Sequence, residues 1–153
     1  MSNVSCHRLA SARGSALIEV AITTPVLVMM IVAIMRFGAA YNYQIVLTDA
    51  ARVGARQLAI SRGTSGDICN TAGTKIQNAA TTLSTSSITM RMTVNGTAYT
   101  AAAGSLPTCN SAGTSMVVNA DVTVSLSYPC SFQIPYFSGP SCTINAATTA
   151  RVE

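Results

Sequence analysis

The chain has 153 residues, of which 49% are hydrophobic and only 9% are charged, and its mean hydropathy is positive. This composition is too apolar for an ordinary soluble domain of the same length. The formal net charge of +4 belongs to residues 1–62, because the remainder is neutral. The charged residues of that remainder are Lys75, Arg91, Arg151, Asp67, Asp121 and Glu153. The basic balance therefore does not indicate a nucleic-acid partner.

Residues 1–14 form a short basic and polar leader. They contain Arg8, Arg13 and the single histidine, His7, and they show no apolar periodicity. The pattern is typical of a cytoplasmic tail or leader rather than of folded structure.

Residues 15–37 predict a transmembrane helix. From Ala16 to Met35 the only strongly polar side chain is Glu19, and at about 1.5 Å per residue this run spans roughly 30 Å, the thickness of a bilayer's hydrocarbon core. A carboxylate in such a span costs about 2.5–3.5 kcal/mol, which indicates a partner or a function. Pro25 removes one backbone hydrogen bond and predicts a bent or locally unwound helix.

Residues 38–62 continue the helix in amphipathic form. Apolar or small residues recur at spacings of three and four, and Asp49 lies three residues before Arg52 on the polar face. Gly63 is placed to end the helix. We therefore expect one helix from Ser15 to about Ser61. Its apolar stripe is Tyr43, Leu47, Ala50 or Ala51, Gly54 and Leu58.

Residues 63–153 predict a small α+β domain. A weakly periodic segment, 71–83, is the expected helix, and residues 88–94 and 97–101 alternate around Asn95-Gly96, a strong hairpin signal. Residues 118–128 and 142–152 also alternate, and a loop containing Pro129, Pro135 and Pro140 separates them. Each strand has one apolar and one hydroxyl-rich face, which predicts an antiparallel sheet covered on one side by the helix. The predicted fold is pilin-like.

Four of the five cysteines, Cys69, Cys109, Cys130 and Cys142, lie in this domain. Two disulfides in a small domain that follows a membrane segment indicate an oxidising compartment such as the periplasm. Three connectivities are possible. Pairing Cys69 with Cys109 and Cys130 with Cys142 is favoured, because the second pair brackets the proline-rich loop. Reduced, buried thiols are the less favoured alternative, and no two cysteines have the short spacing of a zinc knuckle.

Several motifs resemble those of one family. Gly14-Ser15-Ala16-Leu17-Ile18-Glu19 fits a prepilin-peptidase site, Pro25, Phe37-Gly38 and Tyr41 follow, and the helix then carries an A-A-R-x-G-A-R signature. The chain resembles the TadE-like pseudopilins of tight-adherence (Tad, Flp) pili. The signature residues are Ala50, Ala51, Arg52, Gly54, Ala55 and Arg56, and the segments Val122 to Pro129 and Ala146 to Glu153 are similar to the family's closing strands.

The resemblance implies a structural protein rather than an enzyme. A prepilin peptidase would cleave after Gly14, so that Ser15 becomes the first residue and Glu19, one helical turn along, pairs with its amine or with that of a neighbouring subunit. The chain would be a minor pseudopilin of the inner membrane with its C-terminus in the periplasm. It would take part in pilus biogenesis and adhesion or enter an extracellular pilus. Its partners would be the peptidase, other pilins or pseudopilins, the Tad assembly machinery and inner-membrane lipid, with no cofactor, metal or nucleic acid.

Other interpretations stay open. The alternative is an uncleaved, permanently anchored periplasmic component of an envelope assembly or secretion complex. A signal peptide cleaved after Ala40 is less favoured, because the apolar run is long. The small residues of the signature suit packing either between subunits or within one protomer. Residues 135–137, Pro-Tyr-Phe, suit an exposed aromatic contact surface or a loop against the sheet edge. An enzyme is disfavoured, because His7 would leave with the leader and no glycine-rich phosphate loop follows a strand.

Overall fold

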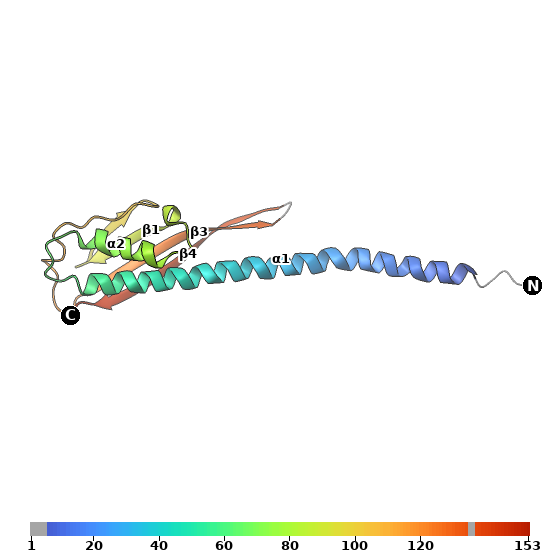
Figure 1. Ribbon diagram of the computed structural model, residues 1–153, viewed down its shortest axis with the longest axis horizontal. Helices are drawn as coiled ribbons and strands as arrows, with labels where there is room; N and C mark the ends of the chain where they lie inside the picture. The colour runs from blue at the N-terminus through green and yellow to red at the C-terminus, as the bar shows by residue number, and fades with distance from the viewer. Residues whose placement is uncertain (1–5, 135–136) are drawn as a thin grey trace, which may run out of the picture. The chain divides into compact units, whose positions relative to one another are not determined.

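The computed structural model describes residues 6–134 and 137–153. The chain divides into two compact units, Met1–Gly38 and Ala39–Glu153. One long helix, α1 (Cys6–Ala59), contributes to both units, and every other element belongs to the second unit (Figure 1).

Helix α1 begins earlier than the sequence analysis expected. Residues 6–14 are helical rather than an irregular leader. This part of the leader contains alanine, leucine and arginine, which favour helix, and it has no proline to stop the helix from extending backward. At the other end α1 stops at Ala59, and Gly63 takes a left-handed conformation with φ of 78°. The predicted glycine therefore does turn the chain just after the helix.

The expected unwinding at Pro25 is absent, because α1 is continuous through this residue. The fixed φ of proline is compatible with a helix, and the helix loses only the hydrogen bond that the missing N–H would have donated. The two threonines before it lie against the turn that precedes them: Thr23 donates to the carbonyl of Glu19 at 2.9 Å and Thr24 to that of Val20 at 2.7 Å. These hydroxyl bonds hold side chains to the backbone on the N-terminal side of the proline.

The second unit contains a four-stranded antiparallel sheet with strand order β2-β1-β3-β4. Its other elements are α2 (Ile68–Ala79), a short 3₁₀ turn, η1 (Thr85–Ser87), and the strands β1 (Thr89–Val94), β2 (Thr97–Ala101), β3 (Asp121–Ile134) and β4 (Phe137–Arg151). The α+β prediction is confirmed. The β1–β2 hairpin turns at Asn95 and Gly96, which have φ of 51° and 77°, as a tight turn that matches the twist of the strands requires.

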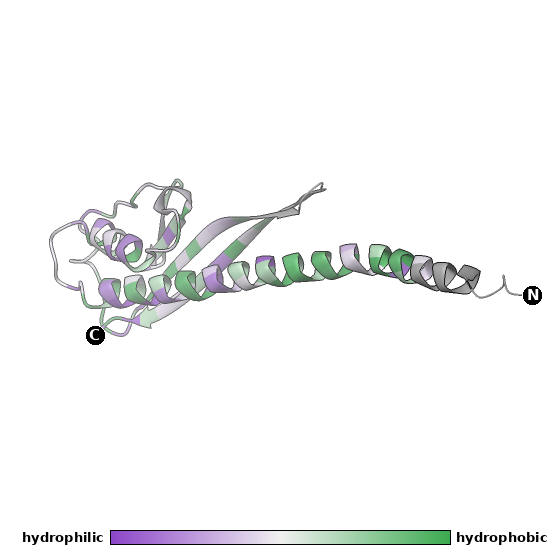
Figure 2. Ribbon diagram, turned by 45° about the vertical axis from the view of Figure 1, so that its right-hand side comes forward, coloured by the Kyte–Doolittle hydropathy of each residue, from purple (hydrophilic) through white to green (hydrophobic). Residues whose placement is uncertain are grey.

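The core lies between one face of the sheet and the two helices. Alternate residues of β1 and β3, among them Met90, Met92, Val122 and Val124, are fully buried, whereas Thr123 and Thr149 share a hydroxyl contact of 3.0 Å on the opposite face. Polar and apolar residues alternate along the sheet, and the α1 segment from Gly14 to Gly38 is mostly apolar (Figure 2). One face of the sheet is thus covered and the other is wet, as the alternation predicts.

One expectation about the sheet is wrong. The segment around Pro129 and Pro140 is not a loop, because β3 continues to Ile134 and β4 starts at Phe137, leaving residues 135–136 outside the described part. Strands β1 and β3 pair only as far as Thr89 opposite Ser127. Strands β3 and β4 continue to pair with each other beyond that point. Beyond Ser127, β3 has a free edge, where a proline removes no ladder hydrogen bond to a third strand. Strand β3 also starts at Asp121 rather than at residue 118.

Candidate processing and assembly site

The predicted processing residues lie on the exposed surface of α1. Gly14 and Ser15 are exposed, and a side chain at Gly14 would meet nothing within 4 Å. Both residues lie inside the helix. Glycine costs about 0.8–1 kcal/mol relative to alanine in a helix interior, so the helix is locally weakened at Gly14.

Glu19 lies one helical turn after Ser15, on the same side of α1, and its residue is exposed. The large apolar residues on both sides of it in the chain are also exposed, from Leu17 at 71% to Phe37 at 71%. The described residues contain one helix that is long and apolar enough to cross a membrane, and its window lies within Gly14–Ala59. A carboxylate at the start of such an apolar surface is costly in lipid unless it gains a cationic partner.

The helix signature divides into two faces. Ala50, Ala51, Gly54 and Ala55 are buried in the core of the second unit, whereas Arg52 and Arg56 are exposed. The structure therefore uses the small residues for packing within the chain, and this resolves the alternative that the sequence left open. On the polar face, Arg52 forms the expected ion pair with Asp49 at 3.3 Å.

Gly54 is the closest point of this packing. A Cβ added at this position would lie 2.5 Å from Cδ1 and 2.6 Å from Cγ1 of Ile76, and 3.7 Å from Val124. Ile76 comes from α2 and Val124 from β3, so three elements meet at the missing side chain. Real Cβ atoms do not approach other carbons this closely, and the site admits glycine because it has no side chain.

An aromatic contact joins the Ala39–Ala59 part of α1 to β3, and a polar contact joins it to β4. Tyr43 packs edge to face on Tyr128 with ring centroids 5.7 Å apart, and Gln44 donates to the carbonyl of Asn145 at 3.2 Å. Just beyond the helix, Arg62 donates to the carbonyl of Glu153 at 3.3 Å. From the Gln44–Asn145 contact to the Arg62–Glu153 contact, the residue numbers increase along both segments. Strand β4 and this part of α1 therefore run in the same direction.

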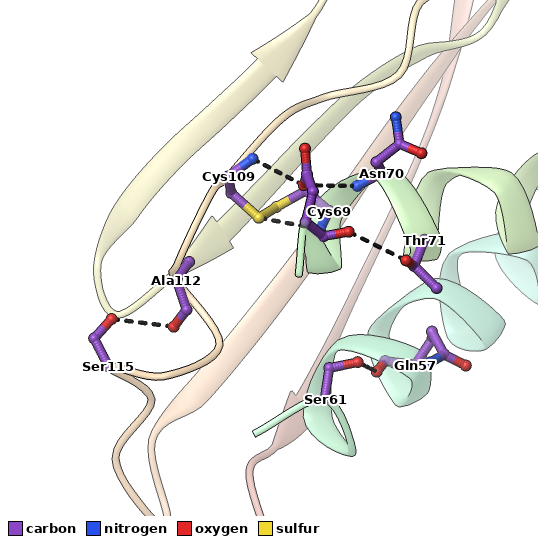
Figure 3. The surroundings of a disulfide bond; sticks show 9 residues. Gln57, Ser61, Cys69, Asn70, Thr71, Cys109, Ala112 and Ser115 are labelled. Atoms are coloured by element: carbon purple, nitrogen blue, oxygen red, sulfur yellow. Dashed lines mark hydrogen bonds between the residues drawn. A yellow bond between two sulfur atoms is a disulfide. The ribbon is translucent and has the colours of Figure 1, made fainter. Parts of the chain in front are cut away.

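The first disulfide joins Cys69, at the start of α2, to Cys109 in the loop after β2, with Cα atoms 5.5 Å apart. Asp67 was not foreseen as important and stands beside it. Its carboxylate caps α2 by accepting from the N–H of Asn70 at 3.1 Å, and the same oxygen accepts from the N–H of Cys109 at 3.1 Å. Figure 3 shows these bonds around the disulfide. An aspartate directly before a helical segment is the N-cap signal that could have identified this residue.

Asp67, Cys69 and Cys109 have ligand atoms within 4.8 Å of one another. This arrangement resembles a metal site only in its residue types. The two sulfurs are bonded to each other and are not thiolates, which are the form of cysteine that binds metals. The carboxylate is already engaged by two backbone N–H groups. The cluster is therefore a covalent and hydrogen-bonded link between α2 and the loop.

The second disulfide joins Cys130 to Cys142, which face each other in the β3–β4 register with Cα atoms 5.0 Å apart. Both disulfides follow the pairing favoured by the sequence. This one does not bracket a loop. Instead it links two strands in the part of the hairpin that lies beyond β1.

A long apolar helix that continues into a small disulfide-bonded α+β unit defines a pilin-like class of protein. Residues 14–56 match the family model of TadE-like protein, so this segment is similar to that family. The match begins at the predicted processing glycine and ends at the last arginine of the signature. TadE-like proteins are structural proteins associated with tight-adherence pili. Neither the comparison with curated proteins nor that with solved structures finds a match.

Proposed function

We propose that this protein is a minor pseudopilin of a tight-adherence pilus, cleaved by a prepilin peptidase after Gly14 and anchored in the inner membrane by α1. The second unit would lie in the periplasm and take part in pilus biogenesis and adhesion, in contact with other pilins or pseudopilins and the assembly machinery. The observation that carries the proposal is the TadE-like segment, residues 14–56. It includes the weakened helical position at Gly14, the lone carboxylate of Glu19 and the exposed apolar residues after it.

The two disulfides support the periplasmic placement, because such bonds persist in an oxidising compartment. A permanently anchored, uncleaved component of an envelope complex would share the same helix and the same disulfides. The state of the N-terminus is what separates the two functions.

The first prediction concerns that N-terminus. Mass spectrometry of the protein from bacterial membranes is expected to find a mature chain that starts at Ser15. Gly14→Leu is expected to leave the leader attached, because a bulky side chain blocks the close approach of the backbone to the peptidase and strengthens the helix at that point. Ala10→Leu, in the leader itself, is the control and should be processed as usual. An intact leader on the unaltered protein would favour the uncleaved anchor.

The second prediction concerns Glu19. Its carboxylate is proposed to pair with the Ser15 amine of its own or a neighbouring chain, so that two charges enter lipid together. Glu19→Ala and Glu19→Gln should therefore be cleaved yet largely absent from sheared pili and from the assembly complex, whereas Glu19→Asp should be partly retained. The readout is immunoblotting of the sheared and membrane fractions. Normal incorporation of Glu19→Ala would remove this role from the proposal.

A further inference from the structure

The sheet has two free edges, one formed by β2 and the other by β4. The two-residue turn of the β1–β2 hairpin makes the first pair across the strands a hydrogen-bonded one, and bonded and non-bonded pairs then alternate. The N–H and C=O groups of Ala98 and Thr100 therefore point away from β1. Within residues 6–134 and 137–153, no hydrogen bond reaches these outward groups.

The outer edge of β4 has the same form. The same alternation, followed through β1 and β3, points the N–H and C=O groups of Asn145, Ala147 and Thr149 away from β3. The hydrogen bond that Gln44 donates to the carbonyl of Asn145 agrees with this direction. Among the described residues, none bonds to the outward groups of Ala147 or Thr149.

Neither edge has the features that usually prevent a sheet from pairing with another chain. Residues 97–101 of β2 and 142–150 of β4 contain no charged residue and no proline. Neither stretch has a bulge in its pairing with the neighbouring strand. A free edge of this kind is a template for a further strand.

The two edges have opposite strand directions. Each neighbouring pair in the order β2-β1-β3-β4 is antiparallel, so β2 runs opposite to β4. A second copy with the same orientation would therefore place its β2 antiparallel to the β4 of the first. Antiparallel pairing of two like edges would instead need a twofold rotation. That rotation would point the two Ala39 ends, to which the anchors are joined, in opposite directions.

The pairing of neighbouring strands defines rows of residues that cross the sheet. One row consists of Ala98, Thr93, Thr123 and Thr149, and the next of Thr100, Arg91, Ser125 and Ala147. If Ala98 of a second copy follows Thr149 of the first, both rows continue into the second copy without a step along the strands. Thr100 of the second copy then follows Ala147.

This register uses the outward groups that have no partner in the described part of the chain. Both contacts are hydrogen-bonded pairs, each of which exchanges two N–H···O bonds. The paired side chains are alanine or threonine, so no bulky group stands between the strands. The carbonyl of Asn145 takes no part, and its bond to Gln44 is kept.

We propose that β2 of one copy of this protein pairs with β4 of the next, so that the two sheets become one continuous antiparallel sheet. The proposal rests on the proposed function, which anchors all copies in one bilayer and so favours a contact that keeps their directions the same. Because the contact joins two different surfaces, further copies can add in the same way. The twist of each sheet would turn such a row into a helical arrangement.

The test is cysteine cross-linking of the full chain in bacterial membranes. All variants carry Cys6→Ser, so that the cysteines of the two disulfides are the only others. Ala98→Cys and Thr149→Cys, on separate chains in the same cells, are expected to form a disulfide-linked dimer on non-reducing gels. Their Cα atoms would lie about 5.5 Å apart, within the range of a disulfide. Either variant alone should give no dimer, and both changes in one chain should give a ladder.

Asn145→Cys is the matched control for the register. It lies on the same edge, four residues or about 13 Å from position 149, and should not cross-link with Ala98→Cys. Thr100→Pro, added to the chain with both cysteines, should lower the ladder about tenfold, because it removes an outward N–H that the contact needs. This N–H bonds to nothing within the sheet, so the unfolding temperature of the purified chain should stay close to that of the unaltered protein.

Other outcomes refute separate parts of the scheme. If Ala98→Cys and Thr149→Cys do not cross-link in anchored chains, the edge contact is wrong and the proposed function is untouched. Dimers of either variant alone would show a contact between like edges, and a preference for Asn145→Cys would overturn the register. Alkaline extraction of the same membranes tests the anchor. Release of the chain into the soluble fraction would refute the anchoring in the proposed function, whether or not the copies cross-link.

Discussion

Replacing Cys69 and Cys109 together by alanine is expected to lower the free energy of unfolding of the second unit by about 4 kcal/mol. The bond closes a segment with a sequence separation of 40, and the chain-entropy model assigns about 4 kcal/mol to a loop of this length. Because small domains have total stabilities of only about 5–15 kcal/mol, this loss is a large fraction of the stability of the unit. Asp67 would also lose one of its two aligned N–H partners, because the disulfide holds the Cys109 segment beside it.

The measurement is denaturant unfolding of the full chain in a mild detergent, followed by the near-ultraviolet circular dichroism of its tyrosines. The matched control is the pair Cys130→Ala and Cys142→Ala. Its separation is 12, for which the same model gives about 3 kcal/mol. Its loss should loosen mainly the part of β3 and β4 that pairs beyond Ser127, which hydrogen exchange can localise. If the Cys130–Cys142 control lost more stability than the Cys69–Cys109 variant, the link between α2 and the following loop would not have the central role assigned to it.

A leucine at Gly54 is expected to disrupt the packing of α1 on the second unit. Even the first added carbon would lie 2.5 Å from Ile76, and overpacking of a core typically costs about 1–3 kcal/mol, with more expected for a full side chain. Position 54 lies where α1, α2 and β3 meet, so the helix cannot move away without opening the core. We expect low yields of folded protein and faster proteolysis of residues beyond 59.

Gly38→Leu provides the control, because it places the same residue in the same helix where nothing lies within 4 Å of an added Cβ. It should be neutral or slightly stabilising, since leucine favours helix more than glycine does. Adding Ile76→Ala to Gly54→Leu should restore part of the lost stability by making room for the new side chain. Equal stability of Gly54→Leu and Gly38→Leu would contradict the close contact between position 54 and Ile76. The signature would then be better explained by packing between subunits.

The sequence by itself determined the long helix, the hairpin at Asn95-Gly96 and the α+β class. These features depend on local rules: an apolar run of membrane length, a two-residue turn that needs positive φ, and strict alternation along strands. It also placed Gly14, Ser15, Glu19 and the helix signature in a TadE-like pattern, which the family match to residues 14–56 confirms. Cleavage and the role of Glu19 stay predictions.

Only the tertiary structure decided what the signature packs against and how far the last two strands extend. Glycine is needed at position 54 because Ile76 and Val124 leave no room for a side chain. These two residues lie far away in the sequence, so no local pattern at position 54 reveals the requirement. The prolines at 129 and 140 suggested a loop because they disrupt central strands. They are tolerated here because β3 has a free edge beyond Ser127 and β4 is itself an edge strand. Edge position is a property of the assembled sheet, and no single strand's sequence contains it.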